Sequence, residues 1–384
     1  MTATSLTRPG ERNRIGSKLA EIDWTFIGLL CVIAGTGAIM LYSVGGGSFT
    51  PWAANHIVRF GVFLAMTLVL AMVDIRVWFA ISYPTYAVAL LLLVAVEVAG
   101  DTRMGATRWL EIGPVSFQPS EIMKIGLVLA LARFYHGATA QAAKWSWRLL
   151  IPAALIAAPV GLVAHQPDLG SSLLILGTGI AIVFVAGITW RVVAAGAAAV
   201  AVIAPLMFFF VLHEYQRQRV LTFLNPEADP SGAGYHTLQG KIALGSGGFL
   251  GKGFGLGSQS QLNYLPEKHT DFIYASLAEE FGFIGALGLL IVYGIVIGQS
   301  LRVATISHSH FGRLATTGVT ATFALYVLIN AAMIMGLAPV VGIPMPMLSY
   351  GGTVMLTVMI GFGLVMSVRV HRYAEITSGR GTLL

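Results

Sequence analysis

Ten apolar stretches, separated by glycine, proline and charged residues, follow one another along the 384-residue chain. Most are about 20 residues long, enough for a helix rising 1.5 Å per residue to cross a hydrocarbon core of roughly 30 Å. Strand-period alternation is missing, so the pattern predicts spanning helices and not a barrel. The predicted spans are 25–43, 57–73, 78–99, 121–136, 149–164, 171–188, 191–213, 271–297, 312–335 and 351–370.

Composition places the chain among integral membrane proteins of the all-α class. Hydrophobic residues make up 56% of it and charged residues only 10%, whereas soluble domains are about 25% charged. The net charge of +6 does not indicate nucleic acid, because there is no basic run or basic patch with exposed aromatic residues. Cys31 is the only cysteine, which excludes an intramolecular disulfide and a cysteine-based metal cluster.

The distribution of basic residues predicts the direction of the spans. With both termini in the cytoplasm, inner loops and tails hold 14 of the 23 basic residues, as the positive-inside rule favours. We therefore expect a cytoplasmic tail over 1–24, an uncleaved first span, one transmembrane domain over 25–370 and a cytoplasmic tail over 371–384. A long outer loop, 214–270, would connect helices 7 and 8.

Every motif-like stretch then lies on the outer face, where no ATP is available. A synthetic reaction there must use an activated substrate. The glycine-rich segment GSGGFLGKGFGLG, 245–257, resembles a phosphate-binding loop, but Ser246 and Gly253 stand where a P-loop needs glycine and Ser or Thr. Two interpretations stay open: backbone N–H groups that approach a phosphate, or a flexible connecting loop or re-entrant turn.

The segment LPEKHTDFIYASLAEEFG, 265–282, places ionisable residues where a membrane helix begins. An acid at a helix N-terminus caps free N–H groups, which is one interpretation of Asp271. Capping does not explain why Glu267 and His269 are so close. Nor does it explain Glu279 and Glu280, because carboxylates at membrane depth indicate a functional site or an ion pair.

Other charged residues allow two interpretations each. Glu121 and Lys124 are spaced to pair with each other at the start of the fourth helix, or they form a polar wall of a substrate cavity.

Arg108 and Trp109 suit a pyrophosphate and a sugar face, or they anchor the chain at the interface. Arg217 and Arg219 follow the seventh span, where snorkelling alone also accounts for them. Asp168 follows a proline at a helix start and is best explained as a cap.

Four segments, together with the ten-span plan, resemble the SEDS family (shape, elongation, division and sporulation). YHTLQ and FLGKG are closer to its elongation branch than to its division branch. The chain departs from the usual pattern at Gly240, Met345, Met347 and Thr353. The matching segments are ATRWLEIGPVSFQPSEIMK (106–124), HQPDLGSS (165–172), FLNPEADPSGAGYHTLQGKIALGSGGFLGKGFGLGSQSQLNYLPEKHTDFIYASLAEEFGFIG (223–285) and GLAPVVGIPMPMLSYGG (336–352).

The resemblance implies an inverting peptidoglycan glycosyltransferase that polymerises lipid II into β-1,4 glycan during cell elongation. Asp271 would be the general base and undecaprenyl pyrophosphate the leaving group. A glycosidase, by contrast, normally presents two catalytic carboxylates. The candidate substrate-binding residues are Arg108, Trp109, Glu121, Lys124, Arg217, Arg219, Lys252, Gln259, Glu267 and His269. The candidate structural or cavity residues are Asp168, Glu279 and Glu280.

The resemblance also implies surroundings and partners. The chain would lie in the bacterial cytoplasmic (inner) membrane with its site facing outward. Its partners would be lipid II, nascent glycan, a class B penicillin-binding protein, other elongation-complex proteins and membrane lipid. A divalent cation, Mg or Mn, could bind oxygens of Glu267 or Asp271, although no ligand spacing specifies one.

Two rival functions differ in class. A lipid II flippase would also use acids in the membrane, but a transporter should place polar groups near the midplane and on both sides. A non-enzymatic scaffold of the elongation machinery would leave the acids around Asp271 unexplained.

Overall fold

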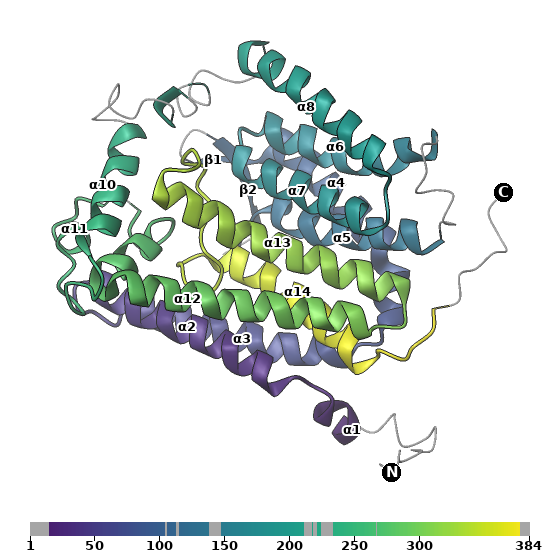
Figure 1. Ribbon diagram of the computed structural model, residues 1–384. Coiled ribbons are helices and arrows are strands. Elements are labelled where there is room, and N and C mark those ends of the chain that lie inside the picture. The colour runs from purple at the N-terminus through teal and green to yellow at the C-terminus, as the bar shows by residue number, and fades with distance from the viewer. Residues whose placement is uncertain are drawn as a thin grey trace.

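The computed structural model describes residues 15–103, 106–112, 115–137, 147–210, 217, 221–223, 233–265 and 267–376. Long helices lie side by side in it (Figure 1). Each predicted span coincides with one helix, which confirms the all-α class. These helices are α2 (Trp24–Val44), α3 (Trp52–Met72), α4 (Ile75–Ala99), α5 (Pro119–Gly137), α6 (Leu150–His165), α7 (Leu169–Val185), α8 (Trp190–Phe210), α12 (Ile273–Ile306), α13 (His310–Met335) and α14 (Gly352–Val370).

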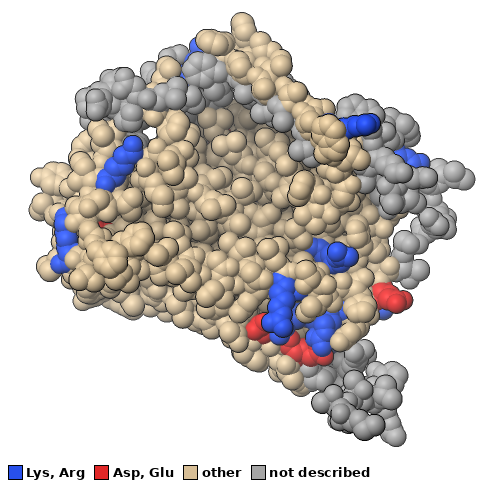
Figure 2. Space-filling model, viewed as in Figure 1, with Lys and Arg blue, Asp and Glu red and all other residues tan. Residues whose placement is uncertain are grey.

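Six of these helices, α2, α3, α4, α12, α13 and α14, are long and apolar enough to cross a membrane. Helices α6 and α7 are apolar but shorter. Figure 2 shows a wide belt free of charged residues, with Lys, Arg, Asp and Glu gathered toward the ends of the helices. The chain is thus a multi-pass membrane protein, while the number of crossings and the direction of the termini stay predictions.

The two ends of the bundle differ in chemistry. At the end of the bundle where the described chain begins and ends, which we call the terminal end, Arg369 pairs with Asp23 at 2.5 Å and Arg372 pairs with Glu21. The 3₁₀ turn η2 (Trp147–Leu149) and α1 (Ile15–Ala20) also belong to this end. The opposite end, which we call the site end, holds the Asp271 turn and the loops around it.

Structure at the site end was only partly expected. A three-stranded antiparallel sheet, in the order β1 (Asp101–Arg103), β2 (Ala106–Ile112) and β3 (Val115–Phe117), connects α4 to α5, although no strand was predicted. The segment predicted as the outer loop 214–270 contains α10 (Ala233–Ser246) and α11 (Ser258–Gln261). Both features need contacts with the bundle, so periodicity along the chain does not reveal them.

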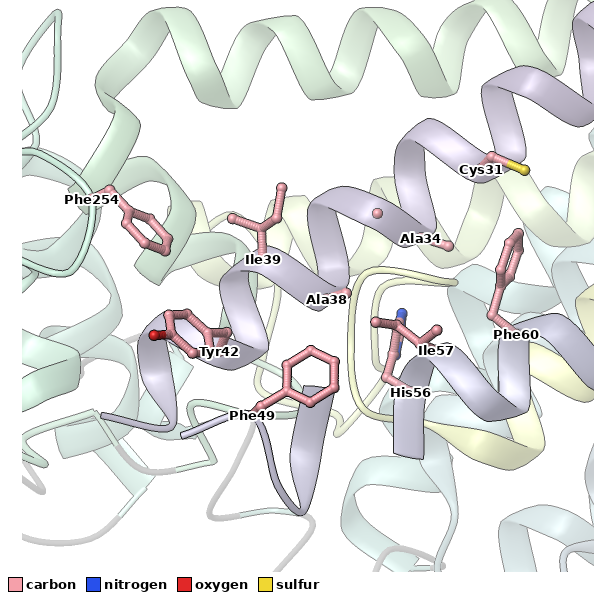
Figure 3. A pocket seen from close by; sticks show the side chains of 11 residues that line it. Cys31, Ala34, Ala38, Ile39, Tyr42, Phe49, His56, Ile57, Phe60 and Phe254 are labelled. Atoms are coloured by element: carbon pink, nitrogen blue, oxygen red, sulfur yellow. The ribbon is translucent and has the colours of Figure 1, made fainter. Parts of the chain in front are cut away.

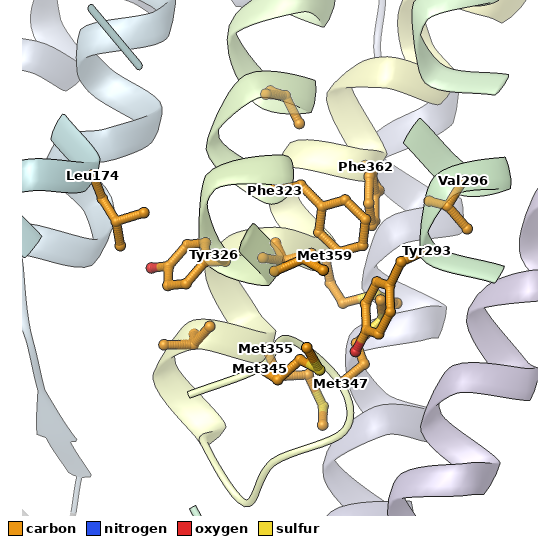
Figure 4. Packing of buried hydrophobic residues seen from close by; sticks show 14 of the residues in the cluster. Leu174, Tyr293, Val296, Phe323, Tyr326, Met345, Met347, Met355, Met359 and Phe362 are labelled. Carbon is orange, nitrogen blue, oxygen red and sulfur yellow. The ribbon is translucent and has the colours of Figure 1, made fainter. Parts of the chain in front are cut away.

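Helix α13 lies at the centre, in contact with α5, α7, α12 and α14. Its Phe323 packs at 4.9 Å, between ring centroids, against Phe362 of α14. Figure 4 shows Met345 and Met347, from the loop between these two helices, entering the same core. Both are buried, so the departures from the family pattern at these positions are core residues, and the loop is fixed to the bundle by its own side chains.

Candidate active site

Asp271 lies in a turn, 267–272, directly before α12. Asn330 of α13 holds this turn, because its Nδ2 donates to the backbone oxygen of Asp271 at 2.9 Å and to that of Ile343 at 2.6 Å. A Cβ added at Gly342 would lie 3.5 Å from Asp271 Oδ2. The carboxylate therefore faces the 336–351 loop, and it is partly exposed.

The helix-cap interpretation of Asp271 does not match the observed boundary. Helix α12 begins at Ile273, and its N-cap position is Phe272. Asp271 precedes that position, in the turn held by Asn330.

Glu267 shapes the same turn. It adopts a φ of 49°, which is uncommon for a residue with a side chain, and its Oε2 accepts from Thr270 Oγ1 at 2.9 Å. Lys268 points back along the chain, where its Nζ donates to Ser260 O at 2.8 Å and Asn263 Oδ1 at 2.7 Å. Glu267 is exposed.

His269 belongs to an aromatic wall next to the turn. Its ring stacks on Trp52 of α3 with 4.3 Å between centroids, and its backbone oxygen accepts from Tyr350 N at 2.9 Å. Trp52 and Tyr350 meet edge to face at 4.8 Å. Burial, followed by the nearby Lys268 charge, lowers the pKa of His269, so its imidazole is neutral at pH 7.

Of the two interpretations of Glu121 and Lys124, the ion pair is observed, with 2.6 Å between Lys124 Nζ and Glu121 Oε1; their predicted contact with substrate stays a prediction. Tyr326 of α13 completes the group, because its hydroxyl lies 2.8 Å from Glu121 Oε2 and also contacts Lys124. Lys124 is 0% exposed. The ammonium group of Lys124 therefore binds Glu121 and Tyr326 in the interior, and these contacts connect α5 to α13.

Asp168 is the predicted helix cap. Its Oδ1 accepts from Ser171 N at 3.0 Å at the start of α7, and its Oδ2 accepts from Gln118 Nε2 at 3.0 Å. The second contact connects α7 to the residue that precedes α5.

Glu279 is 0% exposed and holds the segment that follows α10. Its Oε1 pairs with Lys252 Nζ at 2.6 Å and accepts from Ser258 Oγ at 3.1 Å and Gln259 N at 3.2 Å. Lys252 and Gln259, both predicted to bind substrate, are thus partners of Glu279. The carboxylate is a buried structural anchor within the protein.

Glu280 faces a different neighbour. Its Oε1 accepts from Ser43 Oγ of α2 at 2.5 Å, and the residue is 1% exposed. Neither of the two consecutive acids is exposed enough to form a substrate wall. Because consecutive helical residues point about 100° apart, they connect α12 to two different parts of the protein.

The glycine-rich segment fills a kink in α12. Gly282 has a φ of 67°, which interrupts the helical hydrogen bonds around it. Backbone groups of the segment replace the missing partners. The replacing bonds are Lys252 N to Glu279 O, Gly253 N to Glu280 O, Phe283 N to Gly248 O and Ile284 N to Phe249 O.

Glycine is needed where this segment touches the kink. A Cβ at Gly251 would lie 2.2 Å from Glu280 O, and its φ is +85°. The N–H groups of Lys252 and Gly253 already bind carbonyls of α12, so this stretch resembles the connecting or re-entrant alternative more than a phosphate cradle.

The remaining predicted residues are only partly described. Trp109 lies in β2 and is partly buried. Arg217 donates to the backbone oxygen of Phe209. The side chain of Arg108, and all of Arg219, lie outside the described residues.

An apolar cavity of about 500 Å³ lies between α2 and α3. Its wall includes Ile39, Phe49, Ile57 and Phe60, with Phe254 at one end (Figure 3). Most of the lining suits hydrocarbon, and the polar or ionisable side chains in it are those of Cys31, Tyr42 and His56.

A family model described as FTSW_RODA_SPOVE, cell cycle protein, matches residues 18–374. The chain belongs to this family. The motifs had predicted the SEDS family, and that prediction is confirmed.

Two curated relatives of the FtsW/RodA/SpoVE family illustrate the similarity. Peptidoglycan glycosyltransferase MrdB of Escherichia coli K12 is 41% identical over 352 residues, which cover 92% of this chain and 94% of that protein. Probable peptidoglycan glycosyltransferase FtsW of Trichlorobacter lovleyi is 33% identical over 365 residues, covering 91% and 94%. The expected enzyme class, a glycosyltransferase, is the class named for both.

Solved structures in the FtsW/RodA/SpoVE family share the fold. One, described as "Structural coordination of polymerization and crosslinking by a peptidoglycan synthase complex", matches with a TM-score of 0.80 and 33% identity, covering 92% of this chain and 99% of that one. The rod shape determining protein RodA of Thermus thermophilus matches with a TM-score of 0.69 and 30% identity, covering 92% and 98%.

Several residues of this FtsW/RodA/SpoVE site were not predicted. Trp52, Tyr350, Tyr326 and Asn330 each reach it from a helix or loop far away in the chain. A polar residue or tyrosine inside an apolar run was the available signal, since such residues need a partner at membrane depth. That signal does not say which partner is chosen.

Proposed function

We propose that this chain polymerises lipid II into β-1,4 glycan on the outer face of the bacterial cytoplasmic membrane, with Asp271 as general base. The names of the relatives support the substrate class. The state of the carboxylates supports the choice of Asp271. Glu121, Asp168, Glu279 and Glu280 are buried, and each accepts at least one hydrogen bond from another part of the protein, so a substrate cannot reach them as it could reach a partly exposed acid.

Asp271 differs from these acids in position. It is partly exposed, and its backbone is held by Asn330 between the 336–351 loop and α13. A base must stand within hydrogen-bond reach of the proton it accepts, in a geometry that binding does not have to create. The held turn supports this role.

The reaction follows from these groups. Asp271 would accept the proton of the sugar 4-hydroxyl as that oxygen forms a bond to the anomeric carbon of the second substrate. The bond from that carbon to the undecaprenyl diphosphate oxygen breaks with its electron pair, and the anomeric centre inverts. The diphosphate leaving group supplies the driving force, so no nucleotide is required.

Stacking surfaces for sugar rings lie beside the base. Trp52 and the neutral His269 form a flat wall, and aromatic rings suit the apolar face of a sugar. Trp109 of β2 stays a predicted sugar contact.

The proposed partner is a class B penicillin-binding protein. One structural neighbour is described as a complex that coordinates polymerization and crosslinking. The match covers 99% of one chain in that structure. A partner that crosslinks the glycan would work next to the site end, together with other elongation proteins.

The proposal includes a divalent cation bound together with the diphosphate. Within the described residues there is no group of three His, Cys, Asp or Glu side chains that could hold a metal. Glu267 and Asp271 could give two oxygen ligands, so the diphosphate would have to complete the coordination. Mg and Mn should therefore be varied in the assay.

The test is polymerisation of labelled lipid II by the protein purified with its class B partner, without ATP. Asp271→Asn should lower the rate by about 10²–10⁴-fold, the usual contribution of a general base. Glu97→Gln is the matched control, because Glu97 also lies at the site end and its partner there is the exposed His165.

Three outcomes separate the alternatives. Loss of polymer in Asp271→Asn with lipid II still bound supports the base. Equal polymer from both proteins removes Asp271 from the chemistry. No polymer from either, in a folded preparation, overturns the polymerase proposal, and lipid II transport into vesicles would then be measured.

A further inference from the structure

The cations predicted to bind the diphosphate are largely used by the protein itself. Lys124 is buried against Glu121, and Lys252 pairs with Glu279. Lys268, which neighbours the site turn, donates to a backbone oxygen and an asparagine. A diphosphate carries at least two negative charges, so a further cation near the Asp271 turn would favour its binding.

Arg59 of α3 is a cation with a different environment. Its guanidinium lies 4.7 Å from the ring centroid of Tyr350. In the part of the chain that the structure describes, it has neither a carboxylate partner nor a hydrogen bond, and it is partly exposed. It stands within the apolar span Trp52–Met72, where an arginine without a counter-charge is costly and indicates a function.

Tyr350 sets the direction of this guanidinium. A cation over the ring face is attracted to it, and a planar guanidinium carries N–H groups that can bind two oxygens of one phosphate. Arg59 Nη1 would lie 3.2 Å from a Cβ at Gly352. The absence of a side chain there gives the arginine room at the start of α14.

Arg59 is joined to the base through a short chain of contacts. Tyr350 N donates to His269 O at 2.9 Å, and His269 is two residues before Asp271. Trp52, one end of the aromatic wall, lies two turns before Arg59 on the same helix. The cation and the base are thus parts of one rigid frame built from α3, the site turn and the 336–351 loop.

We propose that Arg59, oriented by Tyr350, binds the diphosphate of the lipid-linked substrate. The ligand follows from the proposed function, on which this inference rests. The geometry contributes the residue, its orientation and its place beside the base. Arg59 was not among the residues predicted from sequence motifs.

The experiment measures binding separately from chemistry. Purified full-length protein in detergent is titrated with undecaprenyl diphosphate and, in parallel, with uncharged undecaprenol. Arg59→Gln should weaken diphosphate binding by about 10- to 100-fold, because it removes a charge-assisted bidentate contact, and should leave undecaprenol binding unchanged. Arg59→Lys should fall between the two, since it keeps the charge and loses the planar fork.

Two further variants sharpen the assignment. Tyr350→Phe keeps the ring and should bind diphosphate like the native protein, whereas Tyr350→Leu should bind it several-fold more weakly. Lys241→Gln, which removes an exposed cation of α10, is the matched control and should have no effect.

Several results would overturn the inference: unchanged diphosphate affinity in Arg59→Gln, equal loss of diphosphate and undecaprenol, or an equal loss in Lys241→Gln. If Arg59→Gln does not fold, the diphosphate affinities of Arg59→Lys and Tyr350→Leu test the inference in its place. Failure of the polymerase proposal is a separate outcome, because it appears as absent glycan in the native protein while diphosphate binding is still measured.

Discussion

The turn at Asp271 and the first turns of α12 present the same chemical group in opposite states. Asp271 is partly exposed, in a turn that faces a loop. Glu279, eight residues later, is buried, with its oxygens bound to an ammonium group, hydroxyl groups and a backbone N–H. The first carboxylate is the proposed base, and the second holds two parts of the protein together.

This difference shows that a carboxylate in a membrane segment is not by itself evidence of a catalytic residue. The partners already present decide what a carboxylate can do. We therefore expect substitutions of Glu279 to lower stability and substitutions of Asp271 to lower activity.

The largest effect is expected at Glu279. Glu279→Gln removes the charge opposite Lys252 and leaves a partly buried ammonium without its partner, so the free energy of unfolding should fall by about 3–5 kcal/mol. Thermal unfolding in detergent measures this. An unchanged midpoint would contradict the anchor role and make Glu279 a candidate for the chemistry.

A smaller loss of stability is expected at the kink. Gly251→Ala adds a Cβ 2.2 Å from Glu280 O at a φ of +85°, which should destabilise the protein by about 2–3 kcal/mol. Gly245→Ala is the control, because a Cβ there meets nothing within 4 Å. If both variants unfold at the same temperature as the native protein, the contact between this segment and α12 does not contribute to stability.

At Asp271 the effect should appear in turnover. Asp271→Glu keeps the carboxylate and moves it by about one carbon–carbon bond, 1.5 Å. A displacement of that size should lower kcat about 100-fold with an unfolding free energy within about 0.5 kcal/mol of native. Lipid II polymerisation and thermal unfolding test both parts. A stability loss like that of Glu279→Gln would erase the contrast between the two regions.

The smallest effect concerns pH at the aromatic wall. Burial lowers the pKa of His269 from its ordinary 6.5, so the folded protein favours the neutral ring. The stability from this preference is complete above pH 6.5 and is lost as pH falls through the lowered pKa. Thermal midpoints between pH 7.5 and 5 should therefore fall less in His269→Gln than in the native protein. Parallel curves would assign the loss to other groups.

Much of the fold follows from local pattern. All ten apolar runs became helices, and the i, i+3 spacing of Glu121 and Lys124 predicted their ion pair. Asp168 as a helix cap also follows from its place after a proline. These features depend on residues close in the chain, whose geometry is set by the helix itself.

Boundaries and loops were less predictable. Helix α3 begins at Trp52 and not at 57, and α12 extends to Ile306 and not only to 297, because the helices continue through polar residues that the hydropathy pattern treats as breaks. The sheet β1–β3 and helix α10 depend on long-range contacts that periodicity does not encode.

By itself, the sequence determined that this is a multi-pass helical membrane protein of the SEDS family, and it pointed to Asp271. Apolar length and motif spacing are local properties, so they can be read along the chain. The tertiary structure decided which polar groups meet: Lys252 with Glu279, Asn330 with the Asp271 turn, and Arg59 with Tyr350. Those pairings are a property of packing, because each joins residues that only the folded bundle brings within hydrogen-bond or stacking distance.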